Sequence, residues 1–354
     1  MEIHEKTCTN VSTIKSKMKA YGKNENLTNE IVDKGLLPES FRNYRQTICA
    51  AWDIETLESP CLVDDEMQTR TEAHLSLVSI GTATNLPGYD DEFFCKNSSD
   101  IGEGQRTVNN WLDYIFQLAS AYQDFIPDEI IKAINKLDEK KKNKFSKNKC
   151  QNQSYLRHLR QYTEFNCFGY NSAKFDLGVI IPFISGYAGL HEIDIKVLKK
   201  GAKYISIGLK NKQGLTVMLK DVLNYTSPMS LDKYLQTWNG SSEKSIFPYQ
   251  HFKKIEELEE TDEFPLKESF FNTLKNESVD DEAYDEAKQE FNRRKALPDD
   301  HPEKIFNFRC WLRLYNLLDC APLVRAIETS FGKFYEYFGV DPMIHLSLPS
   351  IAFK

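Results

Sequence analysis

The sequence lacks the cysteine and histidine patterns of disulfide-rich and zinc-binding proteins. Its eight cysteines are scattered, with no Cys-x-x-Cys pair, and its seven histidines include no His-x-x-x-His pair. A disulfide framework or a tetrahedral zinc site is normally marked by paired spacings of this kind. The cysteines are therefore expected to be reduced, partly buried thiols of an intracellular protein, in the cytoplasm or nucleus.

Long apolar runs and nucleotide-binding loops are also missing. The longest apolar stretch, residues 177–190, is interrupted by Pro182 and Gly186 and is too short to span a bilayer. The N-terminus is charged from its second residue, and no apolar region follows, so we expect no secretory signal and no membrane partner. No Gly-x-x-x-x-Gly-Lys-Ser/Thr segment is present, which argues against a P-loop.

What the sequence does contain is enough apolar material for a large core. The chain has 354 residues, of which 41% are hydrophobic and 12% aromatic. A chain of this length is expected to form two domains, or one large domain with insertions. Its glycine and proline counts, 16 and 13, exclude a collagen-like or low-complexity chain.

The net charge of −7 comes from one stretch of the chain. Residues 255–290 carry 14 acidic residues against three lysines, whereas the remainder has 42 basic against 38 acidic residues, a net of +4. A second biased segment, residues 136–149, contains seven lysines and two acids. Such runs are usually solvated surfaces, and contact with a phosphate backbone is the alternative for the lysine run.

Strand-like and helix-like segments follow one another in an α/β order. Residues 1–40 are weakly patterned and are expected to form an extension or small subdomain. Strand patterns then cover residues 47–55, 75–83, 91–95 and 165–170, with a hairpin over 203–209 and 215–219. Helical spacing marks residues 108–122, 128–137 and 154–162, and helices dominate after residue 221. This order predicts an α/β domain with a mixed sheet, flanking helices and helical insertions.

Two carboxylates end the first strand pattern. Asp53 and Glu55 are two residues apart, so on a strand both point to the same side. Like charges this close are unfavourable unless a cation lies between them, and Mg²⁺ and Mn²⁺ prefer oxygen ligands. The Asp-x-Glu pattern also arises by chance in an acid-rich chain, so it is informative only in combination.

Two later segments supply the combination. Asp176 follows the strand pattern of residues 165–170, and Tyr315 and Asp319 share one face of a late helix because they are four residues apart. The simpler alternatives are that Asp176 caps the next helix and that Tyr315 and Asp319 form the polar edge of an amphipathic helix.

In this order the three segments resemble the DEDDy 3′–5′ exonucleases, most closely the proofreading domain of protein-primed family B DNA polymerases. The motifs are Asp53-Ile-Glu55, Asn171-Ser-Ala-Lys-Phe175-Asp176 and Tyr315-Asn-Leu-Leu-Asp319, and Phe247-Pro-Tyr249 adds context. The resemblance covers about residues 37–354 and implies a ribonuclease-H-like exonuclease core. On this basis residues 41–240 form the core, with an insertion at about 100–160. Residues 241–300 form an acidic helical insertion, and residues 301–354 complete the core.

The resemblance also implies roles for particular residues. The acids matching those that hold two Mg²⁺ or Mn²⁺ ions are Asp53, Glu55, Asp176 and Asp319. Tyr315 matches the tyrosine that positions the attacking water. The residues expected to bind the 3′ end of single-stranded DNA are Thr56, Asn171, Phe175 and Lys233. A polymerase domain or a priming protein is a further expected partner.

Some features depart from the pattern. The gaps of 123 residues between Asp53 and Asp176 and of 143 between Asp176 and Asp319 exceed those of compact proofreading domains, which requires insertions. No polymerase motif follows within the sequence, so the chain alone is not expected to polymerise DNA. Two alternatives stay open: an exonuclease of the same fold that acts on RNA, and a non-catalytic module that binds DNA or docks to a polymerase.

Overall fold

The computed structural model describes residues 27–60, 73–97, 100–142, 149–241, 245–272 and 276–352, which divide into two units. The larger unit takes its described residues from 47–126 and 163–333. The smaller unit takes them from the chain before residue 47, from 127–162 and from 334 onward. Each unit is therefore assembled from segments that are separated in the sequence.

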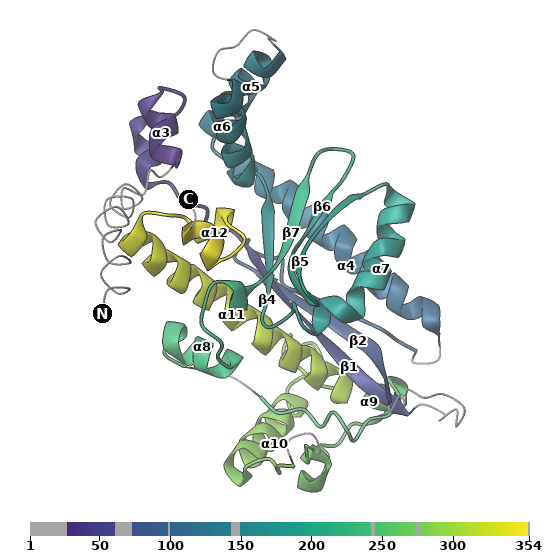
Figure 1. The fold of residues 1–354 in the computed structure, drawn as a ribbon. Helices are drawn as coiled ribbons and strands as arrows, with labels where there is room; N and C mark the ends of the chain where they lie inside the picture. The colour runs from purple at the N-terminus through teal and green to yellow at the C-terminus, as the bar shows by residue number, and fades with distance from the viewer. Residues whose placement is uncertain are drawn as a thin grey trace, which may run out of the picture. The chain divides into compact units, whose positions relative to one another are not determined.

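The larger unit is built on a seven-stranded mixed sheet (Figure 1). The strands lie in the order β3-β2-β1-β4-β7-β6-β5; β1, β4 and β7 are parallel, and the other neighbours are antiparallel. Their bounds are β1 Ala50–Pro60, β2 Ala73–Thr84, β3 Asp91–Phe94, β4 Phe165–Gly169, β5 Asp194–Lys200, β6 Lys203–Lys210 and β7 Thr216–Asp221. The expected α/β fold with a mixed sheet flanked by helices is confirmed.

Alternation along the strands separates two faces of this sheet. Trp52 of β1 points to the face covered by α4 (Ile101–Tyr122), where its ring lies 5.3 Å from that of Trp111. The helix α7 (Asp176–His191) lies against α4. The opposite face carries α11 (Phe308–Phe338), whose Phe331 ring lies 5.6 Å from that of Phe168 in β4. Asp53, the neighbour of Trp52, consequently points toward α11.

Several elements match their sequence patterns, and one strand was not predicted. The hairpin of β6 and β7 is confirmed, as is the helix expected at residues 108–122, which lies within α4. Asp100 caps α4 by accepting a hydrogen bond from the backbone of Gly102. The apolar segment 177–184 lies in α7, and the strand β5 falls where no strand was predicted.

The acid-rich segment forms helices around an aromatic cluster. The helical elements of this region are α8 Leu231–Asn239, α9 Glu256–Glu260, the 3₁₀ helix Lys267–Phe270 and α10 Asp281–Lys295. Phe264 packs against Phe291 and Phe308, with ring centroids 5.4 and 5.8 Å apart. The aromatic cluster therefore joins the insertion to the beginning of α11, the helix that carries Asp319.

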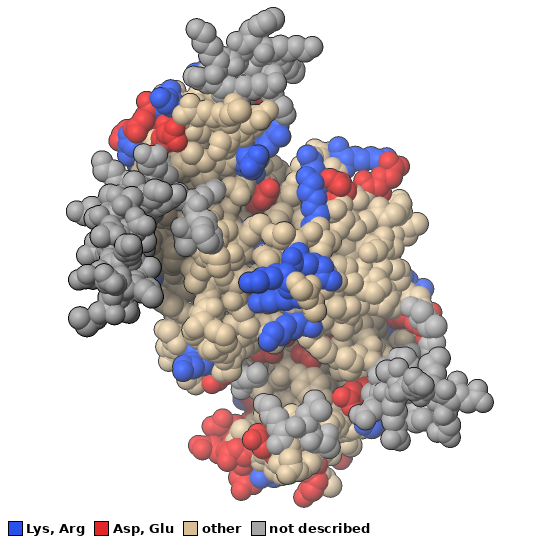
Figure 2. Space-filling model, in the orientation of Figure 1, with Lys and Arg blue, Asp and Glu red and all other residues tan. Residues whose placement is uncertain are grey.

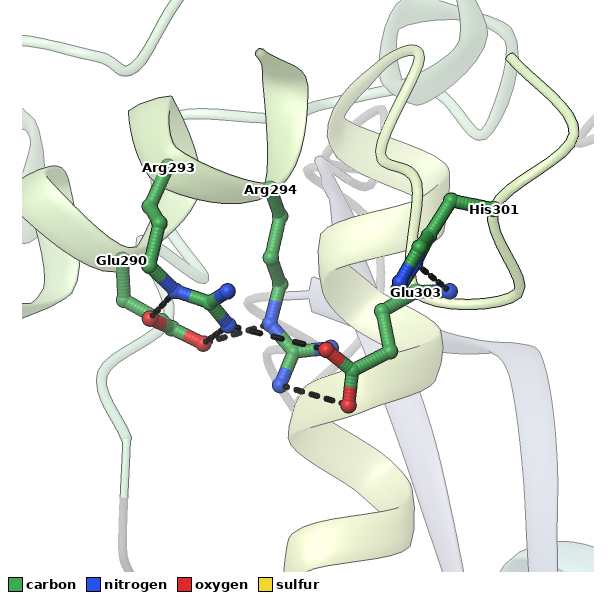
Figure 3. Close-up of polar contacts among 5 residues, drawn as sticks. All are labelled: Glu290, Arg293, Arg294, His301 and Glu303. Carbon is green, nitrogen blue, oxygen red and sulfur yellow. Dashed lines mark hydrogen bonds and ion pairs between the residues drawn. The ribbon is translucent and has the colours of Figure 1, made fainter. Parts of the chain in front are cut away.

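Ion pairs hold the end of α10 to the chain that follows it (Figure 3). Arg293 and Arg294 both pair with Glu290 at 2.6 Å, and both also reach Glu303. The hydrogen bond from Arg293 is the main cause that lowers the pKa of Glu290 to about 2. In the same segment the Nδ1 atom of His301 accepts a hydrogen bond from the backbone of Glu303. Glu290 therefore stays ionised at neutral pH and links two neighbouring arginines at the end of α10.

The smaller unit is helical in its described part. It contains α3 Leu27–Asp33, the 3₁₀ helix Glu39–Asn43, α5 Asp128–Lys142, α6 Lys149–Gln161, the 3₁₀ helix Pro342–Ile344 and α12 Leu348–Ala352. Thr28 of α3 hydrogen-bonds to His158 of α6 at 2.9 Å and to Tyr162 at 3.1 Å. Much of the expected N-terminal extension, residues 1–26, and part of the lysine run, residues 143–148, lie outside the described residues. None of the helices in the described ranges combines the length and apolarity that a membrane span requires.

A close approach between α11 and the sheet depends on Gly81. This residue of β2 lies opposite Asp53 of β1 in the sheet register. A Cβ atom at position 81 would lie 2.2 Å from Oδ1 of Asn316, which is much closer than van der Waals contact. Asn316 in turn donates a hydrogen bond from Nδ2 to Oγ of Ser79 at 2.8 Å. The absent side chain therefore lets α11 lie directly on the strands that carry the acids.

We expect Gly81→Ala to lower the free energy of unfolding by about 1–3 kcal/mol, since the added methyl group must displace the buried Asn316 side chain. Thermal and urea unfolding measure this change. Gly178→Ala is the matched control: it lies in α7 with no atom within 4 Å of the added carbon, so it should stabilise the protein by up to about 1 kcal/mol. Equal effects of the two substitutions would contradict the close approach.

Candidate metal centre

Two elements that are distant in the sequence bring three acids together. Asp53 and Glu55 lie on the face of β1 that points toward α11, and Asp319 is on α11 one turn after Tyr315. Oxygen atoms of the three carboxylates all lie within 4.8 Å of one another. Asp53, Glu55 and Asp319 thus form a cluster that could hold a metal ion; we call it the acid cluster.

The carboxylates of the acid cluster are poorly exposed and repel one another. Glu55 and Asp319 are only 5% and 7% exposed, and Asp53 is half-buried. Burial raises the pKa of Asp53 well above its usual value, and the negative charge of Asp176 is the next largest cause. The charges of Glu55 and Asp319 raise this pKa further. Oxygen donors that repel one another in this way fit a hard divalent cation, which would remove the repulsion.

Asp176 lies close to the acid cluster without belonging to its tightest group. It is the first residue of α7 and 7% exposed, and its charge acts on Asp53. Burial, followed by the charge of Asp221, raises the pKa of Asp176 to about 7. Three of the four acids singled out in the sequence therefore meet directly, and the fourth is their electrostatic neighbour.

Asp221 holds the loop that leads to Asp176. It ends β7, the strand next to β4, and its carboxylate accepts backbone hydrogen bonds from Asn171 at 3.0 Å and from Ala173 at 3.1 Å. It also accepts one from Leu223 at 2.9 Å. Asn171 has a φ of 58°, a left-handed conformation that asparagine tolerates better than most residues. Sequence reasoning missed Asp221, although its place at the end of a strand resembles that of the other acids.

Tyr315 is paired with a second tyrosine that the sequence analysis treated only as context. The hydroxyl groups of Tyr249 and Tyr315 hydrogen-bond to each other, and the rings lie 6.0 Å apart, nearly perpendicular. Desolvation raises the pKa of both phenols, and the charge of Glu55 is the next largest cause for each. Both phenols are therefore protonated at neutral pH and can donate hydrogen bonds near the acids.

Two cavities adjoin the acid cluster, and both are lined by Tyr249 and Tyr315. One has a volume of about 740 Å³ and is rich in aromatic side chains, among them Phe175 and Phe271. The other has a volume of about 590 Å³ and is lined by polar groups that include Lys174 and the acids Asp53 and Asp319. Asp53 and Asp319 thus face the polar cavity, and the two tyrosines line both cavities.

The residues expected to bind a single strand are only partly gathered here. Thr56 and Phe175 line the aromatic cavity, and Phe175 is 43% exposed. Asn171 lines the polar cavity. Lys233 lies on α8 with an exposed side chain; the described residues that line the polar cavity include Ser230 and Leu231 but not Lys233.

Comparisons of this chain with protein-family models, with curated proteins and with solved structures each find no match. The chemistry of the acid cluster therefore has to be argued from its own geometry.

Without divalent ions, we expect the acid cluster to destabilise the protein as the pH rises from about 4 to about 7. The pKa of Asp176 is about 7 in the folded chain against a usual value of 3.8, so the folded state binds more protons than the unfolded state within this window. Magnesium should oppose the loss, by about 2.7 kcal/mol at a concentration 100 times its Kd. The increase in melting temperature should be larger at pH 8 than at pH 5, because protons compete for the ligands.

Thermal unfolding at both pH values, with and without MgCl₂, measures these effects. The control is Asp53→Asn, which removes one charge from the acid cluster and should abolish most of the magnesium-dependent increase. An increase of the same size in wild type and variant would show that magnesium acts elsewhere.

Proposed function

We propose that this chain is a metal-dependent 3′–5′ exonuclease that hydrolyses single-stranded DNA, with a ribonuclease-H-like core of the DEDDy type. The observation that carries the proposal is the acid cluster: carboxylates more than 260 residues apart in the sequence lie within 4.8 Å of one another. Stability alone gives no reason for such a group, because buried like charges cost free energy. A function that needs a cation does give one.

Asp53, Glu55 and Asp319 are the residues that would hold Mg²⁺ or Mn²⁺, with Asp176 completing a site for a second ion. The bound ions supply Lewis-acid stabilisation of the charge on a phosphate group and on the leaving 3′ oxygen. The protein itself has to position the phosphodiester and exclude alternative geometries, since phosphoryl transfer needs little other chemistry from side chains. Asp221 serves this positioning because its carboxylate accepts hydrogen bonds from the backbone of Asn171 and Ala173.

Tyr315 has the properties of a group that orients a water molecule rather than removing its proton. Its raised pKa keeps the phenol protonated, and the hydroxyl group of Tyr249 is its hydrogen-bond partner. A protonated phenol is both a donor and an acceptor, so Tyr315 can hydrogen-bond to a water molecule beside the acids as well as to Tyr249. An ordered phenol in this position can hold a water molecule in line with the scissile bond.

The aromatic cavity favours an unpaired strand as the substrate. Phe175, Phe271 and Tyr249 line this cavity and are partly exposed, with exposed fractions of 43%, 38% and 38%. Stacking of a base on an aromatic side chain contributes about 1–3 kcal/mol and does not depend on sequence. A base inside a duplex is already stacked on its neighbours, so the cavity suits a base near the end of an unpaired strand.

Asp53→Asn should reduce metal-dependent degradation of a single-stranded DNA oligonucleotide by at least about 100-fold, because positioned charge at the reacting phosphate contributes this much or more. The folded state should not be lost, since the substitution removes a repulsion. Degradation is followed on gels with 5′-labelled strands whose 3′ end is free or blocked. Glu328→Gln, an exposed position on the same helix as Asp319, is the control and should retain full activity.

Protection by a 5′ block rather than a 3′ block would reject the proposed polarity. Faster degradation of an RNA strand of the same sequence would favour the RNA enzyme instead. Binding of the strand without any degradation, in Mg²⁺ and in Mn²⁺, would leave only a non-catalytic DNA-binding module.

The two tyrosines should differ in their effects on rate. Tyr315→Phe should lower kcat by about 10- to 1,000-fold while leaving KM and the magnesium-dependent increase in melting temperature nearly unchanged, because it removes the hydroxyl group that orients water. Tyr249→Phe should lower kcat less, because it removes only the hydrogen bond to Tyr315. Loss of the magnesium-dependent stabilisation in Tyr315→Phe would contradict a role confined to water.

A further inference from the structure

The hairpin of β5 and β6 presents a basic surface. Residues 194–210 contain five lysines and one acid. β5 is the edge strand of the sheet, and residues 196–202 are all exposed, so this part of the hairpin is uncovered on both of its faces. In Figure 2 lysine and arginine side chains gather near the centre of the view, over the position of β5 in Figure 1. We call Lys196, Lys199, Lys200 and Lys203 the hairpin lysines.

The hairpin lysines form no close ion pair, although the charge of Lys196 acts on Glu164 and that of Lys203 on Asp221. Within the described part of the chain, no carboxylate oxygen lies within 4 Å of any of their amino groups. Lys212, just after β6, differs because it pairs with Glu192 at 2.8 Å. The amino group of Lys199 lies 4.1 Å from the centre of the Tyr204 ring, which favours an ordered position.

This surface is continuous with the candidate metal centre. The backbone N–H of Tyr204, at the start of β6, donates to the carbonyl oxygen of Ala173 at 3.4 Å. The next residue, Lys174, is exposed and lines the polar cavity together with Asp53 and Asp319. Positive side chains therefore extend from the edge of the acid cluster, through Lys174, to the tip of the hairpin.

We propose that the hairpin lysines bind the sugar-phosphate backbone of a nucleic-acid strand whose 3′ end lies at the acid cluster. The inference rests on the proposed exonuclease function and adds the path that the strand takes outside the site. From Lys196 to Lys200 the strand extends about 13 Å, at about 3.3 Å per residue. This length corresponds to about four nucleotides along one strand of B-form DNA, at about 3.4 Å each.

The charge distribution elsewhere favours this path. Residues 255–290 carry a net charge of −11, and acidic side chains gather over α10 in Figure 2. A polyanion is repelled from the acidic insertion and attracted to the hairpin, so the two surfaces together define one direction of approach. The net charge of −7 therefore does not oppose nucleic-acid binding at the hairpin.

Lysines on an edge strand have a second known use, which the test must separate from phosphate binding. Charged side chains on an exposed edge prevent pairing with the edge strand of another molecule. Glutamate serves this purpose as well as lysine does, whereas it repels phosphate. Lys199→Glu combined with Lys200→Glu should therefore elute like the wild type in size-exclusion chromatography and still lose binding to an oligonucleotide.

The main experiment measures binding without cleavage. A fluorescein-labelled 20-nucleotide single strand is titrated with protein in EDTA, and fluorescence anisotropy is recorded at several NaCl concentrations. Replacing the four hairpin lysines by glutamine should weaken binding at least tenfold at low salt. The slope of log K against log salt should also become shallower by about 2 to 3, because each lost phosphate contact lowers its magnitude by about 0.7. The control, Lys253→Gln combined with Lys254→Gln, removes two exposed charges near α9 and should leave the slope unchanged.

Hydrolysis then separates this inference from the proposed function. A trinucleotide is too short to reach from the acid cluster along the hairpin. Wild type and the quadruple glutamine variant should therefore degrade it equally. For the 20-nucleotide strand, kcat/KM should be at least tenfold lower in the variant.

An unchanged slope and affinity in the quadruple variant would overturn the role of the hairpin even if degradation is normal. Lysine-dependent binding to phosphatidylserine vesicles, with no binding to the oligonucleotide, would overturn it as well. If the wild type binds the strand through the hairpin lysines but does not degrade it, the proposed exonuclease function is rejected and the role of the hairpin in binding nucleic acid is retained.

Discussion

Repulsion among buried carboxylates is the constraint on which the rest of the larger unit depends. Asp53, Glu55 and Asp319 would separate if nothing held their backbones in place, because each charge raises the cost of ionising the others. The absent side chain at Gly81 and the hydrogen bond from Asn316 to Ser79 keep α11 against the strands. The sheet and helix thus hold in place a group of charges that opposes folding, which is typical of sites where function and stability conflict.

Much of this arrangement could be inferred from local patterns in the sequence. The period of two along residues 50–56 places Asp53 and Glu55 on one side of a strand, and the spacing of four places Tyr315 above Asp319. The same rules identify the sheet strands β1, β2 and β4 and the β6–β7 hairpin, because their apolar residues are buried with the expected periodicity. These features depend on neighbours in the sequence, which is why one sequence is enough to find them.

Other features depend on contacts that no local pattern encodes. The strand β5 is rich in lysine and exposed on both faces, so it lacks the alternation by which strands are recognised. Asp221 acts through backbone groups some 50 residues away, and Tyr249 reaches Tyr315 only because the acidic insertion folds back onto α11. Lys233 illustrates the converse: its position between two motifs suggested a role, but its side chain is exposed on α8 and is not among the described residues that line the polar cavity.

The division of the chain into interleaved units has a consequence for the order of folding. The segments of the smaller unit are separated by stretches of 80 and 171 residues that belong to the larger one. Bringing such distant segments together in an unfolded chain is entropically expensive, and the cost increases with the length of the intervening loop. Once the seven-stranded sheet has formed, those loops no longer have to be closed by diffusion. The sheet is therefore expected to act as the folding nucleus. The smaller unit, which contains α3, α6 and the chain from residue 334 onward, should assemble late, once that last segment has been synthesised.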